Sequence, residues 1–522
     1  MVLQAVRGRI ASKKAARLRA LQLGDAGNIL ATKTKGLREL RLEFKYSLID
    51  VDQQVDILST ATPLKHPRLI MSNPYKPAAA PYPARSVDPH KQVLANQHST
   101  GHADDAVAPG DIAVGVVIGR AAEYFDFFVF GIACVLVFPA VFFPFVERLQ
   151  GTLYAFMLFS LAFLVRPLGT VAGMWLQRRY GRSAKLGLAL LLLGCATAGM
   201  ALLPSYEVLG TGAIVLLALC RIGQGLALGG SWDGMPSLLA LKAPENRRGW
   251  YAMLGQLGAP LGFLIACSLF AYLWGHLSRQ EFLDWGWRYP FFTAFAINVV
   301  ALFARLRLVV TPEYERELDA SQLYPCGVRE LLEKQGSNVL IGAFAALASF
   351  ALFHIVTVFP LSWVMLYSQQ GIDEFLAIQI VGALFAAAAM PLSGLIADRM
   401  GRRWTLGLMA VLIGLFGLSA PMLLGGGTIG EDAFILVGFV LLGMSYGQAA
   451  GAVTANFLPH FRYTGAALTA DLAWLMGAAF APLVALSLSA RFGLVAVSVY
   501  LISGAACTLL ALRVNRAISA SD

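Results

Sequence analysis

The chain has 522 residues, of which 57% are hydrophobic and only 14% are charged, and its mean hydropathy is +0.64. Soluble globular domains carry about 25% charged residues, so this composition excludes an ordinary soluble enzyme or binding module. Most of the net charge of +10 comes from the first 110 residues, which hold 16 Lys and Arg against 9 Asp and Glu.

Residues 1–110 contain no apolar run of membrane length, and the stretch 74–89 is rich in Pro and Ala. Met1–Ala20 is basic without an apolar centre, so no signal peptide is predicted. We expect a basic, disordered cytoplasmic extension, to which no function is assigned. The alternatives are a short amphipathic helix at 37–49 that touches anionic lipid, or a start of translation downstream of Met1.

From residue 111 onward, apolar runs of about 20 residues recur, and each can span a hydrocarbon core of about 30 Å. We therefore predict an all-α membrane protein with twelve transmembrane helices. The expected spans are 111–140, 152–176, 185–204, 210–235, 250–273, 288–310, 338–364, 374–397, 404–424, 432–456, 464–488 and 492–513. They form two six-helix halves, 111–310 and 337–515, with a cytoplasmic linker at 311–336 and a tail at 516–522.

Arg and Lys gather in alternate loops, whereas the loops between these are poor in them or, at 274–287, mixed. The positive-inside rule then predicts a multi-pass protein of the inner (plasma) membrane with both termini in the cytoplasm. The six cysteines form no CxxC pair, so neither a disulfide framework nor a metal site is predicted.

Two carboxylates, Glu123 and Asp126, interrupt the first apolar run. A charge in the middle of a bilayer costs about 2.5–3.5 kcal/mol, so an acid kept there is usually partnered or functional. Their spacing of three places both on the same face of a helix. They are candidates to carry a proton or bind a cation. The alternative is a structural pair with an arginine of a neighbouring helix.

A basic turn recurs at the same place in both halves. Arg178-Arg179-Tyr-Gly181-Arg182 follows the second span, and Asp398-Arg399-Met-Gly401-Arg402-Arg403 follows the eighth. Parallel halves with a binding site at their interface are the layout of secondary transporters. We expect these turns to gate the conformational change through Arg178, Arg182, Asp398, Arg399, Arg402 and Arg403.

The turn after the eighth span, Gly394-Leu-Ile-Ala-Asp398-Arg-Met-Gly401-Arg402-Arg403, resembles the loop signature of the major facilitator superfamily. Six motifs in order resemble its metabolite:H⁺ symporter family, which takes up organic acids and compatible solutes in bacteria. They are Gly119…Glu123-Tyr-Phe-Asp126-Phe-Phe, Arg166-Pro-Leu-Gly169, Arg221-Ile-Gly-Gln224-Gly225…Gly229-Gly230, Ala243-Pro-Glu245…Arg248-Gly249, Trp285-Gly-Trp287-Arg288-Tyr-Pro-Phe-Phe and Arg462-Tyr-Thr-Gly465. The resemblance covers about residues 111–515.

The chain departs from the pattern of that family at four positions. Arg178 stands where the first loop signature has an aspartate, and Ser231 and Leu241 replace two glutamates. Asp471 stands where the family usually has asparagine. Because Arg178 cannot accept hydrogen bonds, we expect the turn with Asp398 to carry most of the gate. The departures indicate a divergent branch, so the substrate of a relative need not be retained.

Further candidate residues are polar groups within apolar spans. Arg166 and Arg221 present a planar fork that suits a substrate carboxylate, or they neutralise the acids of the first helix. Asp233 replaces the charge lost at Ser231 or caps a loop. Asp471 is a second proton site or the partner of an arginine across the half-interface. The proton-coupling and substrate candidates together are Glu123, Asp126, Arg166, Arg221, Gln224, Asp233, His354 and Asp471, of which His354 is alternatively a packing residue.

No HExxH, CxxC or P-loop motif is present, so neither an enzyme nor an ATP-driven pump is predicted. We predict a secondary active transporter that carries a small organic acid with protons by alternating access. The proton gradient is the coupling force, and no cofactor is expected. The alternatives are proton-coupled uptake of an osmolyte of the betaine or proline type, and an uncoupled facilitator or exporter. The expected partners are a small-molecule substrate and the lipid bilayer; the chain is expected to be a monomer that binds no nucleic acid.

Overall fold

The computed structural model describes residues 109–514, except 310, 312–315, 317, 320, 322 and 450–456. The chain divides into two units, Met1–Asp88 and Pro89–Asp522, and every described residue belongs to the second. The predicted extension up to residue 108, parts of the predicted linker and the tail 516–522 lie outside the described residues.

All regular structure in the described part of the chain is helical. The first half consists of α4 (Pro109–Leu136), α5 (Phe138–Val141), α6 (Arg148–Tyr180), α7 (Arg182–Ala201), α8 (Tyr206–Leu209), α9 (Thr211–Gly230), α10 (Met235–Lys242), η2 (Glu245–Arg247), α11 (Arg248–Leu254), α12 (Gly258–His276), α13 (Arg279–Glu281), η3 (Phe282–Gly286) and α14 (Arg288–Val309). The second consists of α16 (Val328–Ala345), α17 (Leu347–Thr357), α18 (Phe359–Tyr367), α19 (Ile372–Met400), α20 (Arg402–Leu424), α21 (Gly427–Tyr446), η4 (Pro459–Phe461), α23 (Arg462–Ala473), η5 (Trp474–Ala478), α24 (Ala481–Phe492) and α25 (Val495–Val514).

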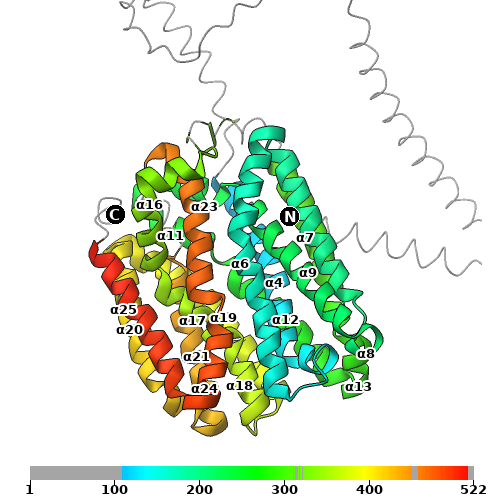
Figure 1. The fold of residues 1–522 in the computed structure, drawn as a ribbon. Coiled ribbons are helices and arrows are strands. Elements are labelled where there is room, and N and C mark those ends of the chain that lie inside the picture. Colours follow the sequence, from blue (N-terminus) through cyan, green and yellow to red (C-terminus); the bar gives the residue numbers. More distant parts are fainter. Residues whose placement is uncertain are drawn as a thin grey trace, which may run out of the picture. The chain divides into compact units, whose positions relative to one another are not determined.

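The two halves lie side by side, with α4–α14 in cyan to green and α16–α25 in light green to red (Figure 1). The two basic turns are equivalent: Gly181 (φ 87°) joins α6 to α7, and Gly401 (φ 83°) joins α19 to α20. Only glycine adopts this left-handed conformation without strain. We call the end of the bundle that carries these turns, α10, α11 and the start of α23 the basic end.

Small residues bring α9 and α6 into close contact. A Cβ atom added at Gly229 would lie 2.1 Å from the carbonyl oxygen of Arg166, and one at Gly225 would lie 2.4 Å from that of Ala162. Gly225 and Gly229 are four apart and therefore share one face of α9, the spacing at which membrane helices approach closely. This contact fixes the position of Arg166 relative to α9.

Several predicted spans are interrupted where they meet the half-interface. The predicted span 210–235 ends at Gly230, and α10 begins only after Gly234, whose φ is 81°. The span 338–364 consists of α16, α17 and α18, and Pro360 stands in the first turn of α18. The span 464–488 contains the π-helical turn η5. Proline and glycine at such breaks disfavour a continuous helix, which the apolar pattern alone does not reveal.

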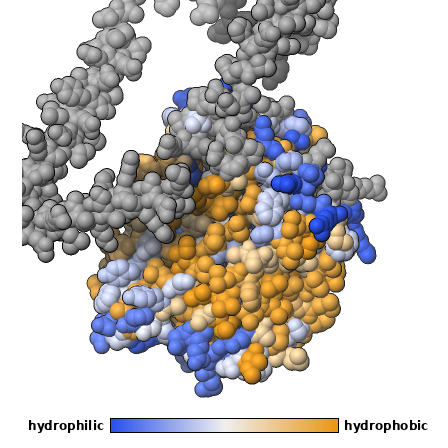
Figure 2. Space-filling view, turned by 180° about the vertical axis from the view of Figure 1, so that it is seen from behind, coloured by the Kyte–Doolittle hydropathy of each residue, from blue (hydrophilic) through white to orange (hydrophobic). Residues whose placement is uncertain are grey.

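Ten helical segments of the described residues are long and apolar enough to cross a membrane. One of them, Arg148–Ala201, contains both α6 and α7. Helix α4 is not among the ten because it carries Arg120, Glu123 and Asp126. Hydrophobic residues cover the middle of the face in Figure 2, and hydrophilic residues gather toward its upper and lower margins. The chain is a helical membrane protein, whereas the predicted count of twelve is supported only in part.

Candidate functional site

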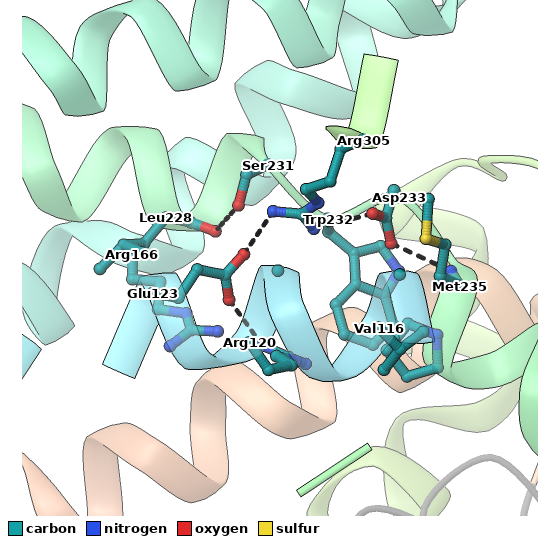
Figure 3. A pocket seen from close by; sticks show the side chains of 13 residues that line it. Val116, Arg120, Glu123, Arg166, Leu228, Ser231, Trp232, Asp233, Met235 and Arg305 are labelled. Atoms are coloured by element: carbon teal, nitrogen blue, oxygen red, sulfur yellow. Dashed lines mark hydrogen bonds and ion pairs between the residues drawn. The ribbon is translucent and has the colours of Figure 1, made fainter. Parts of the chain in front are cut away.

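Arg305 on α14 connects two carboxylates of other helices. Its Nη1 lies 2.7 Å from Glu123 Oε1, and its Nη2 lies 2.7 Å from Asp233 Oδ2 (Figure 3). Arg120, one turn before Glu123 on α4, places its Nη1 2.9 Å from the other oxygen, Oε2. Glu123 therefore shares its charge between two guanidinium groups, which is the setting in which a buried acid stays ionised at least cost.

The sequence predictions did not include Arg120 or Arg305. A signal for each was nevertheless present, because both are arginines within an apolar span, where an unpartnered charge is costly. Arg120 also stands at position i−3 to Glu123, a spacing that favours ion pairs on a helix.

Asp233 caps the start of α10 and pairs with Arg305. Its Oδ1 accepts a hydrogen bond of 3.0 Å from the backbone N–H of Met235 at the start of α10, while Oδ2 binds Arg305. Ser231, where the resemblance would place a glutamate, donates a hydrogen bond to the carbonyl of Leu228 (Figure 3). Because α9 ends at Gly230, Asp233 lies outside that helix and pairs with Arg305 on α14.

Asp126 has a different environment from Glu123, although the two are three residues apart. It is 1% exposed, and Gln224 donates to both of its oxygens at 3.2 and 3.0 Å. Thr197 donates to Oδ1 at 2.9 Å. Among the described residues it forms no ion pair, because Arg221 reaches it only through the side chain of Gln224.

Arg221 itself is 1% exposed and lies among aromatic rings. Its guanidinium carbon is 4.0 Å from the centroid of the Phe130 ring, and Nη2 donates to the carbonyl of Phe159 at 3.2 Å. Cation–π contacts of this kind stabilise a buried arginine without an acid.

Arg166 pairs with an acid of the other half. Its Nε lies 2.8 Å from Oδ1 of Asp471 on α23, and Thr170 donates to Oδ2 of the same carboxylate. Asp471 is 3% exposed. Of the two roles considered for Asp471, the structure therefore places it as the partner of an arginine across the half-interface.

His354 on α17 lies inside an aromatic cluster at the half-interface. Its ring stacks on Phe127 at a centroid distance of 5.2 Å and lies 6.1 Å from Trp474. Nδ1 is 3.3 Å from Thr357 Oγ1, and Nε2 has no hydrogen-bond partner among the described residues. The packing role considered for this residue is the one that these contacts favour.

Three adjoining spaces, of about 360, 700 and 310 Å³ including their openings to solvent, share walls at Arg120 and Arg166. Residues of the first half line the first space, and residues of both halves line the other two. Glu123 lines the first and third, and Asp233 and Arg305 line the first (Figure 3). The candidates that line none of the three are Asp126, Arg221, Gln224, His354 and Asp471. The candidates thus separate into a group at the cavity and a group behind its walls.

The second basic turn connects the halves through Asp398. Its Oδ1 accepts from the backbone N–H of Gly249 at 2.6 Å, and its Oδ2 accepts from that of Trp250 at 3.2 Å. These amides open α11, so the acid meets the positive end of a helix. A Cβ atom at Gly249 would lie 2.7 Å from that of Ala397, so this approach requires glycine.

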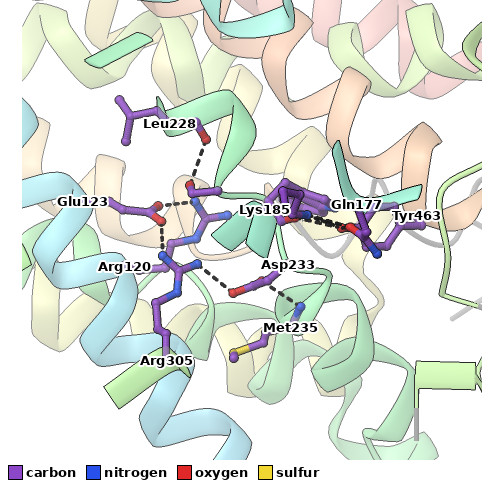
Figure 4. Close-up of polar contacts among 11 residues, drawn as sticks. Arg120, Glu123, Gln177, Lys185, Leu228, Asp233, Met235, Arg305 and Tyr463 are labelled. Carbon is purple, nitrogen blue, oxygen red and sulfur yellow. Dashed lines mark hydrogen bonds and ion pairs between the residues drawn. The ribbon is translucent and has the colours of Figure 1, made fainter. Parts of the chain in front are cut away.

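In and beside the first basic turn, side chains donate hydrogen bonds, whereas Asp398 in the second turn accepts them. Arg178 Nη1 donates to the backbone carbonyl of Cys326 at 3.2 Å. Lys185 on α7, which was not predicted, donates to Gln177 Oε1 and to the hydroxyl of Tyr463 on α23, both at 2.8 Å (Figure 4). Contacts between the halves at the basic end therefore involve both turns. The remaining gating candidates range from buried to exposed: Arg402 is buried, Arg182 and Arg403 are partly exposed, and Arg399 is exposed.

Comparison with known proteins agrees with the sequence analysis and the structure on the fold and the type of protein. Residues 127–470 match the family described as Major Facilitator Superfamily. The chain is 36% identical to an inner membrane metabolite transport protein, YhjE, of Escherichia coli over 77% of this chain and 92% of that one. It is 31% identical to the shikimate transporter of Escherichia coli (75% and 91% covered) and 28% identical to its proline/betaine transporter (69% and 74%).

Solved structures with a similar arrangement of helices include a D-xylose–proton symporter. It aligns with a TM-score of 0.60 over 77% of this chain and 96% of that one, at 19% sequence identity. A second structure, of the proton:xylose symporter XylE with a bound deoxyglucose derivative, aligns with a TM-score of 0.62 at 17% identity. At these identities the structures support the fold alone.

Proposed function

The chain belongs to the Major Facilitator Superfamily, and we propose that it carries a small organic acid across the membrane together with a proton. Its relatives are transporters, so the prediction that it is not an enzyme is confirmed. Members of this superfamily bind small-molecule substrates within the membrane. The substrate, the coupling ion and the orientation are the parts that we propose.

The observation that carries the proposal is the contrast between two acids on one face of α4. Glu123 lines the cavity and is neutralised by Arg120 and Arg305. Asp126 lies behind the cavity, with Gln224 and Thr197 as its hydrogen-bond partners. Transport that is coupled to protons needs a site that binds and releases a proton as the cavity changes sides.

Asp126 can be accommodated in either protonation state. As a carboxylate it accepts from Thr197 and from Gln224. As a carboxylic acid it can donate to the Thr197 hydroxyl, which is both a donor and an acceptor. In both states Asp126 keeps hydrogen bonds to Thr197 and to Gln224.

The substrate part of the proposal rests on the guanidinium groups at the cavity. Arg120 and Arg166 line all three spaces, and a guanidinium fork binds a carboxylate through two parallel hydrogen bonds. We place the basic end in the cytoplasm of a bacterial inner membrane by the positive-inside rule. The contacts of Asp398 would then close the cytoplasmic side in one of the two states of the transport cycle.

Uptake into proteoliposomes tests the proposal. A labelled organic carboxylate should accumulate when the lumen is made alkaline, and a protonophore should abolish the accumulation. The variant Asp126→Asn should lose accumulation but keep exchange of labelled for unlabelled substrate. Asp284→Asn, at an exposed position of η3, serves as the matched control. Equilibration of the label without accumulation in the pH gradient would indicate an uncoupled facilitator, and accumulation that is insensitive to the protonophore would contradict coupling to protons.

A further inference from the structure

We infer that the substrate is a monocarboxylate with a flat, apolar ring as its body. This inference rests on the proposed function and specifies the substrate class of the same site. It concerns the largest of the three spaces, about 700 Å³ including its opening to solvent, which we call the aromatic chamber. Arg120 and Arg166 line it together with the rings of Tyr124, Phe350, Tyr446 and Trp474.

The charge of the chamber favours an anion over a cation. Its only charged lining residues, among the described residues, are the two arginines, and Glu123 faces the neighbouring spaces instead. Aromatic rings alone would also suit a quaternary ammonium group. Here such a group would lie in the same chamber as two guanidinium groups and no acid, so the observations favour an anion with an apolar body.

The number of charges favours one carboxylate over two. Three arginines at the cavity are matched by three acids, because Arg120 and Arg305 pair with Glu123 and Asp233, and Arg166 pairs with Asp471. One proton and one monoanion together add no net charge to this group. A dicarboxylate with one proton would leave an excess charge in a low-dielectric site, which is costly.

The aromatic wall is fixed in place before a ligand arrives. Phe350 lies edge-on to Trp474 and to Tyr446, with ring centroids 5.1 and 5.4 Å apart. The hydroxyl of Tyr124 bonds to that of Tyr446 and donates to Gln256 Oε1. The hydroxyls of Tyr124 and Tyr446 and Gln256 Oε1 satisfy one another. Trp232 Nε1 and Ser237 Oγ, which also line the chamber, have no hydrogen-bond partner among the described residues and can donate to a carboxylate of the ligand. A flat ring gains the most from such a surface, because aromatic pairs contribute about 0.5–1.5 kcal/mol beyond the area that they bury.

Equilibrium binding to the purified full-length chain in detergent tests the inference, with labelled benzoate as the probe. Unlabelled benzoate should compete fully, and cyclohexanecarboxylate, whose ring is puckered and not aromatic, should compete more weakly. Succinate, acetate and glycine betaine should compete at least about tenfold more weakly, a difference of 1.4 kcal/mol. Benzyl alcohol, which has the ring without the charge, should not compete.

Variants separate the ring contacts from the charge contacts. Phe350→Ala should lower the affinity for benzoate at least tenfold and leave the weak affinity for acetate unchanged. Phe350→Leu retains most of the apolar volume and should lower the affinity for benzoate by an intermediate factor. This second variant shows whether the loss in Phe350→Ala comes from misfolding. Phe492→Ala, at a ring that is 71% exposed, is the control. If succinate or betaine binds as tightly as benzoate, or if both Phe350 variants bind benzoate normally, the inference is wrong while the proposed organic-acid transport stands. If no carboxylate binds, the proposed function fails as well.

Discussion

Arg166 on α6 and Asp471 on α23 form an ion pair across the interface of the two halves, with Nε 2.8 Å from Oδ1. The two residues are more than 300 positions apart in the chain, and both side chains are largely buried. This pair joins the wall of the cavity to a helix of the other half. A transport cycle that separates the halves on one side has to break or rotate it.

The first prediction concerns the energy of this pair. Asp471→Asn leaves Arg166 without its acid, and breaking a buried pair from one side costs about 3–5 kcal/mol. We expect a lower thermal unfolding temperature in detergent and slower uptake. The double variant Arg166→Gln/Asp471→Asn should recover much of the stability but not the uptake, because the guanidinium group at the cavity is missing. Strictly additive losses of stability would show that the two side chains are not coupled.

The second prediction concerns Glu123. Glu123→Gln removes the charge that Arg120 and Arg305 share, while Asp233 still neutralises Arg305. Uptake driven by a pH gradient should fall at least about tenfold, equivalent to 1.4 kcal/mol, and exchange should be affected less. Glu207→Gln, at an exposed position, is the matched control. Normal gradient-driven uptake by both Glu123→Gln and Asp126→Asn would exclude the two acids as the coupling site.

The third prediction concerns the contact between Asp398 and the start of α11. Asp398→Asn replaces a carboxylate at two backbone N–H groups by a neutral amide, and hydrogen bonds to charged groups are worth about 1.5–3 kcal/mol. A cysteine introduced at Ala470, in the chamber, should therefore react faster with a reagent applied from the basic end. Arg399→Gln, at an exposed position of the same turn, should leave the rate unchanged. An unchanged labelling rate in Asp398→Asn would show that this contact does not help to close the basic end.

The fourth prediction concerns the packing of α9 on α6. Gly229→Ala would put a methyl group 2.1 Å from the Arg166 carbonyl oxygen, so the helices must separate and the protein should unfold at a lower temperature. Gly187→Ala is the matched control, because α7 has open space there. It should be neutral or stabilising by up to about 1 kcal/mol, since alanine favours a helix. The measurement is the fraction of protein that remains monodisperse after heating, and equal behaviour of the two variants would contradict the close packing.

The sequence by itself determined the class of the protein. Runs of about 20 apolar residues cannot remain in water and must satisfy their backbone as helices in a membrane. The repeated turns around Gly181 and Gly401 showed that there are two related halves, and the ordered motifs identified the superfamily. The cost of charge in a bilayer also marked Glu123, Asp126, Arg166, Arg221 and Asp471 as residues that need a partner or a function.

Only the tertiary structure decided which partner each of these residues has. Periodicity places a residue on a face of its own helix, but it does not state which other helix that face meets. Arg166 therefore had several candidate acids until α23 brought Asp471 to it, and Arg305 was overlooked although it joins Glu123 to Asp233. The breaks after Gly230 and at Trp474 also depend on packing, because apolar composition is the same in a straight helix and in an interrupted one. The pairing of charges between helices is a long-range property, and it distinguishes Glu123, Asp233 and Asp471, which pair with arginines, from Asp126, which forms no ion pair among the described residues.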